Sequence, residues 1–170
     1  VDFKWRSLTL NDKMEGTSGR VIPLTPYFKQ LLVALRASQE QTTDIERRVG
    51  RNTSNEIEAR PNWVFVSQTA ADGRIAEPRG AHVKALSAAG LPHLTLHGLR
   101  RSFGTLSEWC ETPVGVVAQI QGHKPSAIAE KHYRRRPLDL LRQWHDQIEL
   151  WILKEADVHP SPELPGGPSD

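Results

Sequence analysis

Tyr133 lies among four cations and a histidine, in the stretch Lys131-His132-Tyr133-Arg134-Arg135-Arg136. Neighbouring cations favour the ionised form of a phenol, and a phenolate is an effective nucleophile. The other tyrosine of the chain, Tyr27, lies at a predicted helix start without such neighbours. Tyr133 is therefore the candidate nucleophile, and a surface tyrosine in a solvated basic patch is the ordinary alternative.

His97 and Arg100 are three residues apart in a segment with helical periodicity, which predicts that both side chains leave the same side of a helix. An imidazole beside a guanidinium is useful where a phosphate lies between them. The pair alone is common in proteins, and a solvated helix face would produce it equally well.

A second candidate anion site is the junction Gly122-His123-Lys124. Gly122 is predicted to end one helix in a left-handed conformation, and Lys124-Pro125 is predicted to begin the next. The free backbone N–H groups of a helix start attract anions. His123 precedes Tyr133 by ten residues.

Taken in order, His97-Gly98-Leu99-Arg100, Gly122-His123 and Tyr133 resemble the signature of the tyrosine recombinase (phage integrase) family. The stretch from Lys13 through Arg20-Val21-Ile22-Pro23-Leu24 resembles the β-hairpin of that family, whose turn presents a lysine. We therefore carry this role over to Lys13, with Arg20 and Lys4 as the competing residues.

The resemblance implies an enzyme that cuts and rejoins DNA through a 3′-phosphotyrosyl intermediate. Tyr133 would attack the phosphate, Arg100 and His123 would bind its oxygens, His97 would exchange a proton with Tyr133, and Lys13 would protonate the leaving 5′ oxygen. The implied partners are double-stranded DNA attachment sites and, for a full-length protein, three further copies in a tetramer. Further DNA-binding side chains are expected at Arg101, Lys124, Lys131, Arg134 and Arg135.

No cofactor is expected, and no metal either, because the nearby histidines lack carboxylate or thiolate companions at ligand spacing. Two other functions remain open at this point: a non-catalytic DNA-binding module with the same fold, and a type IB topoisomerase-like enzyme.

In the family that the chain resembles, the first catalytic arginine lies in a motif that precedes the hairpin. We therefore expect residues 1–156 to be the C-terminal part of a catalytic domain that is inactive by itself.

The predicted fold is α+β and mainly α-helical, as in the tyrosine recombinase catalytic domain, with a small antiparallel β-hairpin at one edge. Alternation predicts strands over 6–12 and 20–24, and an apolar run predicts a short buried strand over 63–66. Helices are predicted over 26–38, 77–89, from 96, from the Thr112-Pro113 cap to Gly122, over 124–133, and over 138–155. The polar segment 39–60 is either an extension of the first helix or a flexible insertion.

Apolar residues at helical spacing give the expected core: Leu99, Phe103, Leu106, Val116, Val117, Ile120, Leu141, Trp144, Ile148, Trp151 and Ile152. The last helix, with its tryptophans, either belongs to this core or packs onto a neighbouring protomer.

The composition limits what the chain can be. Its 170 residues carry a net charge of +2. The tail from Asp157 onward holds three acids and no Lys or Arg, so the rest of the chain carries 22 − 17 = +5, which is compatible with an anionic partner. A single cysteine, Cys110, excludes a disulfide within the chain, is expected to be a buried thiol, and fits a reducing cytoplasm. No apolar run is long enough to span a bilayer. The Pro/Gly-rich tail, 157–170, is expected to be disordered.

Overall fold

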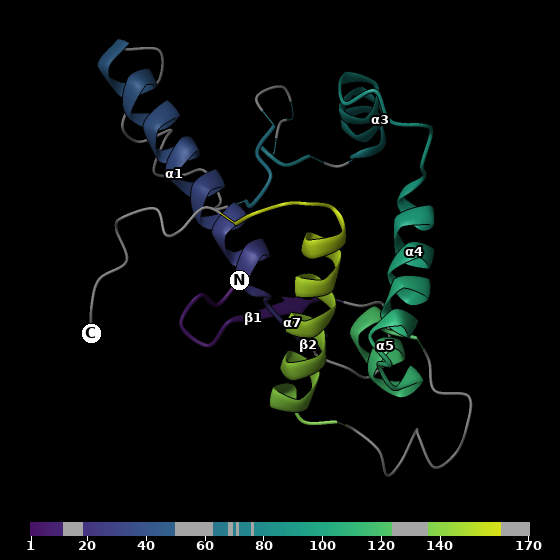
Figure 1. Ribbon diagram of the computed structural model, residues 1–170. Helices are drawn as coiled ribbons and strands as arrows, with labels where there is room; N and C mark the ends of the chain where they lie inside the picture. The colour runs from purple at the N-terminus through teal and green to yellow at the C-terminus, as the bar shows by residue number, and fades with distance from the viewer. Residues whose placement is uncertain are drawn as a thin grey trace. The chain divides into compact units, whose positions relative to one another are not determined.

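A computed structural model describes residues 1–11, 19–49, 63–67, 70, 72–75, 77–123 and 136–160, with the backbone alone over 43–49. The elements in chain order are strands β1 (Ser7–Leu10) and β2 (Arg20–Pro23), then helices α1 (Pro26–Val49), α3 (Arg79–Ala88), α4 (Leu96–Trp109), α5 (Val114–Gln121) and α7 (Leu138–Glu155) (Figure 1). For the described residues, this confirms a mainly helical α+β fold with a small antiparallel sheet.

The chain forms two compact units. One contains residues 1–27 together with 101–170, and the other contains residues 28–100. Helices α1 and α4 each contribute residues to both units.

The β-hairpin opens the first unit. Its strands pair antiparallel, with Leu8 opposite Ile22 and Leu10 opposite Arg20. Both strands are shorter than predicted. Arg6 has a φ of 48°, in the left-handed region, so it belongs to the turn that precedes β1 rather than to the strand. Pro23 ends β2, as expected for a residue that has no N–H to donate.

The core of the first unit forms where α5 meets α7. Val116 and Ile120 of α5 and Leu141 of α7 are buried together, and Phe103 and Trp144 pack against them. Helix α7 also packs on β2. The predicted inward faces of α5 and α7 are confirmed at Val116, Ile120, Leu141 and Ile148. On the last turn of α7, Leu153 is buried and Ile152 is half-buried.

Three local predictions were wrong. Residues 63–66 are not a buried strand, because the only pairing in the described residues there is a single bridge between Val66 and Arg74, and all four side chains are exposed. Leu99 is 45% exposed rather than in the core. Thr112 makes no side-chain cap on α5, whose N-cap residue is Pro113.

The predicted start of the first helix and the predicted glycine after α3 are confirmed. Helix α1 begins at Pro26 and continues to Val49, so part of the polar segment extends that helix. Gly90 follows α3 in a left-handed conformation.

The predicted helix over 124–133 and residues 161–170 of the tail lie outside the described residues. None of the described helices is both long and apolar enough to cross a membrane.

Candidate functional site

The first turn of α4 presents His97 and Arg100. Thr95 caps this turn: its hydroxyl oxygen accepts a hydrogen bond from the Gly98 N–H at 2.8 Å, and its carbonyl accepts one from the Leu99 N–H at 3.0 Å. Because His97 and Arg100 are three residues apart on the same helix, their side chains leave neighbouring points of its surface. The His97 side chain is exposed and that of Arg100 is half-buried. The predicted helix that carries both residues is confirmed.

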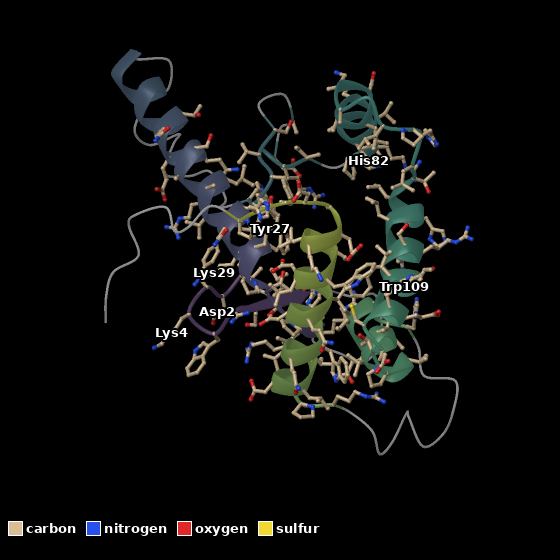
Figure 2. The ribbon with its side chains drawn as sticks, viewed as in Figure 1. Asp2, Lys4, Tyr27, Lys29, His82 and Trp109 are labelled. Atoms are coloured by element: carbon tan, nitrogen blue, oxygen red, sulfur yellow. The ribbon has the colours of Figure 1, made fainter. Side chains whose placement is uncertain are left out.

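Gly98 allows the chain before α4 to pack closely on the helix. A Cβ at this position would lie 2.7 Å from Cδ1 of Leu94 and 3.2 Å from the Thr95 hydroxyl. The carbonyl of Leu94 lies 2.6 Å from Nε2 of His82 on α3 (Figure 2), which requires the tautomer with a proton on Nε2. Helix α3 therefore holds, through His82, the segment at Leu94 that leads into the first turn of α4.

Arg101 follows Arg100 in the sequence. Because an α-helix has 3.6 residues per turn, the Arg101 side chain leaves the helix about 100° around its axis from that of Arg100. Its side chain is exposed, which suits a contact with an anionic partner.

His123 lies directly after the end of α5. Gly122 has φ 70° and ψ 35°, the predicted left-handed cap. The backbone N–H of His123 donates to the carbonyl of Ala118 at 2.8 Å, which closes the cap. The His123 side chain is exposed. Its backbone is therefore fixed to the helix while its imidazole faces outward.

The guanidinium of Arg20 lies against this turn. A Cβ added at Gly122 would overlap Nη1 and Cζ of Arg20. Lys4 lies instead in the exposed turn before β1 (Figure 2), with its Nζ 5.6 Å from the centroid of the Trp5 ring. Of the two residues that compete with Lys13, Arg20 thus lies against Gly122, the residue directly before His123.

His97 and Arg100 belong to the unit of residues 28–100, whereas Arg101 and His123 belong to the other unit. The meeting of His97, Arg100 and His123 at one phosphate stays a prediction. The remaining predicted site residues lie outside the described residues: Lys13, Lys124, Lys131, Tyr133, Arg134 and Arg135.

Sequence reasoning missed three residues whose hydrogen bonds hold the backbone near predicted site residues in the chain: Thr95, His82 and Gln119. Thr95 had a visible signal, a hydroxyl residue immediately before an amphipathic helix. Gln119 on α5 had none; its side-chain amide pairs with the backbone of Arg136, 17 residues away. Among the described residues, no three His, Cys, Asp or Glu side chains are grouped so that they could hold a metal ion.

Comparison with known proteins gives one strong similarity. The chain is 56% identical over 158 residues, 93% of its length, to the prophage integrase IntF of Escherichia coli (strain K12), and spans 30% of the length of that relative. No family model matches the chain. No solved structure matches it.

Proposed function

Because the chain belongs to the phage integrase family of tyrosine recombinases, we propose that it takes part in site-specific DNA recombination and integration. The observation that carries this proposal is the 56% identity to a prophage integrase over nearly the whole chain. The reaction is cleavage and religation of DNA strands through a 3′-phosphotyrosyl intermediate.

In the proposed reaction the Tyr133 oxygen attacks the phosphorus of a DNA phosphodiester. A bond forms between the tyrosine oxygen and phosphorus, and the bond from phosphorus to the 5′ oxygen breaks. His97 takes the proton of Tyr133, and Lys13 gives a proton to the leaving 5′ oxygen. The phosphotyrosyl ester conserves the energy of the broken phosphodiester bond. A 5′ hydroxyl of another strand can therefore attack this ester, release Tyr133 and restore the DNA backbone.

Arg100 and His123 neutralise the charge on the two nonbridging oxygens. A guanidinium can bind phosphate oxygens through two parallel N–H groups, and an imidazole adds a third hydrogen bond. The capped first turn of α4 supports this role for Arg100, because Thr95 fixes the backbone that carries both His97 and Arg100. The cap at Gly122 supports it for His123.

The proposed partners are double-stranded DNA attachment sites in the cytoplasm, bound by four copies of the full-length protein. Arg101, Lys124, Lys131, Arg134 and Arg135 would contact backbone phosphates, so binding should weaken steeply as salt is raised. The proposed chemistry uses only side chains of the protein.

A covalent-trapping assay tests the nucleophile. The complete protein that carries this chain is incubated with a duplex nicked near the cleavage point. Cleavage then releases a short oligonucleotide with a free 5′ hydroxyl, which diffuses away, so the adduct accumulates. Tyr27→Phe is the matched control, because Tyr27 is the chain's other tyrosine. We expect a protein–DNA adduct with the wild type and with Tyr27→Phe, and none with Tyr133→Phe.

Other results would favour the other functions. DNA binding without any adduct would indicate a non-catalytic DNA-binding module. Relaxation of supercoiled DNA without site preference would indicate a topoisomerase. An adduct that persists in Tyr133→Phe would show that another residue is the nucleophile.

A substrate with sulfur in place of the bridging 5′ oxygen tests the proton donor. A thiolate leaves without a proton far more readily than an alkoxide, because a thiol has a pKa of about 8.5. We expect cleavage by Lys13→Ala to be slow on normal DNA and restored on the sulfur substrate. Rescue of Lys4→Ala or Arg20→Ala instead would transfer the role to that residue.

A further inference from the structure

Gln119 on α5 holds the backbone of Arg136. Its Nε2 donates to the Arg136 carbonyl at 3.0 Å, and its Oε1 accepts from the Arg136 N–H at 3.1 Å. One side-chain amide thus satisfies both backbone groups of a single residue, as a neighbouring β-strand would. Both hydrogen bonds are partly buried, so water competes poorly for them.

The side chain of Arg136 rests on the same helix. A Cβ added at Gly115 would overlap the Arg136 guanidinium, so the glycine leaves room for this approach. Gly115 and Gln119 are four residues apart and therefore lie on one side of α5. Arg136 is fixed to α5 by its backbone and by its side chain.

Arg136 follows Tyr133 by three residues. Three residues of chain reach at most about 10 Å. The hydrogen bonds from Gln119 therefore fix a point of the chain that is only three residues from Tyr133 in the sequence. His123 is tied to the same helix by its hydrogen bond to Ala118, so α5 anchors the chain on both sides of the stretch that contains Tyr133.

We propose that Gln119 is a positioning residue for the nucleophile, acting through its hydrogen bonds to the backbone of Arg136. This inference rests on the proposed function of Tyr133. Correct placement of a nucleophile contributes large rate factors, and a small displacement lowers the rate strongly. Gln119 should thus affect the rate of phosphotyrosyl formation and leave the affinity for DNA unchanged.

The test compares Gln119→Met with Gln143→Met in the complete protein, using the nicked duplex. Methionine has nearly the length of glutamine and cannot form the two hydrogen bonds, and Gln143 is exposed on α7. For Gln119→Met we expect adduct formation to slow by roughly tenfold or more, with a Kd for DNA within about twofold of the wild type. For Gln143→Met we expect wild-type values of both.

The sulfur-substituted substrate separates positioning from proton donation. A misplaced nucleophile remains misplaced whatever the leaving group, so Gln119→Met should stay slow on this substrate while Lys13→Ala recovers. Recovery of Gln119→Met to the wild-type rate would overturn the proposal. So would equal rates for Gln119→Met and Gln143→Met.

Gln119→Glu provides a readout that a loss of folding would not give. An ionised carboxylate can accept from the Arg136 N–H but repels the Arg136 carbonyl, whereas a protonated carboxyl can donate to that carbonyl. The rate of Gln119→Glu relative to the wild type should therefore rise as pH falls through the carboxyl pKa. A ratio that does not change with pH would overturn the proposal.

Failure of the proposed function gives a different result. If the wild type forms no adduct, or if Tyr133→Phe still forms one, then Tyr133 is not the nucleophile. That outcome overturns both proposals, whereas a fast Gln119→Met with an inactive Tyr133→Phe overturns only the role of Gln119.

Discussion

The guanidinium of Arg20 on β2 lies against Gly122, the left-handed residue that ends α5 directly before His123. A side chain at residue 122 would meet two obstacles: a φ of 70°, which L residues rarely adopt, and overlap with Arg20. A non-glycine residue held in such backbone geometry costs about 1–3 kcal/mol. We therefore expect Gly122→Ala to lower the free energy of unfolding by about that amount, measured by urea denaturation.

Gly80→Ala is the matched control. Gly80 lies in α3 with an ordinary φ, and no described atom lies within 4 Å of a Cβ built there. Alanine is favoured over glycine in helices by up to about 1 kcal/mol, so Gly80→Ala should leave the stability unchanged or raise it slightly. The loss in Gly122→Ala should shrink when Arg20 is also changed to alanine. Equal losses with and without Arg20 would mean that the overlap contributes nothing.

We expect His145 on α7 to make the free energy of unfolding depend on pH. Its ring meets Phe103 edge-on at 5.7 Å between centroids, and its Nδ1 lies 3.2 Å from the carbonyl of Pro23. Burial lowers the pKa of His145, and the Pro23 carbonyl, Glu149 and Asp146 only partly offset this effect. Below the ordinary histidine pKa of about 6.5 the unfolded chain binds a proton that the folded chain does not.

The free energy of unfolding should therefore fall as pH drops below about 6.5, with a contribution of up to about 1.4 kcal/mol per pH unit from this one residue. We expect His145→Gln to flatten that part of the curve, measured by urea denaturation between pH 5 and 8. His93→Gln, at an exposed position, should keep the wild-type slope. Parallel curves for wild type and His145→Gln would assign the pH dependence to other groups.

The sequence was most informative where short-range chemistry decides the structure. Gly122 ends α5 as predicted, because glycine accepts a left-handed cap without steric cost. Pro26 begins α1, because a first-turn proline lacks only an N–H that the helix does not use. The placement of His97 and Arg100 on one side of α4 followed from their spacing alone.

Contacts between residues far apart in the sequence left no such pattern. Arg6 pairs with Asp146 at 2.7 Å across 140 residues. The side chain of Gln119 forms hydrogen bonds with the backbone of Arg136, and neither residue type predicts such bonds. Helical periodicity also does not show whether the apolar side of a helix is covered by other parts of the chain. For this reason Leu99 was assigned to the core although it is 45% exposed.

Cys110 should react slowly with alkylating reagents in the folded protein. The residue is 6% exposed, and burial raises the pKa of its thiol. The thiolate is the reactive form, so both access and ionisation oppose reaction. With iodoacetamide at pH 8 we expect modification at least about tenfold slower in the native protein than in urea, because reaction requires local opening. Mass spectrometry of the intact protein measures both rates, and equal rates would show that Cys110 is accessible.

Glu149 on α7 caps the first turn of α1. Its carboxylate accepts hydrogen bonds from the Thr25 hydroxyl and, at 2.8 Å, from the backbone N–H of Tyr27. A carboxylate at a helix start satisfies an otherwise unpaired N–H and interacts favourably with the helix dipole. We expect Glu149→Ala to lower the free energy of unfolding by about 1–2 kcal/mol, measured by urea denaturation. Glu155→Ala, at an exposed position on the same helix, should change it by less than about 0.5 kcal/mol. If the two variants unfold alike, the cap does not stabilise the protein.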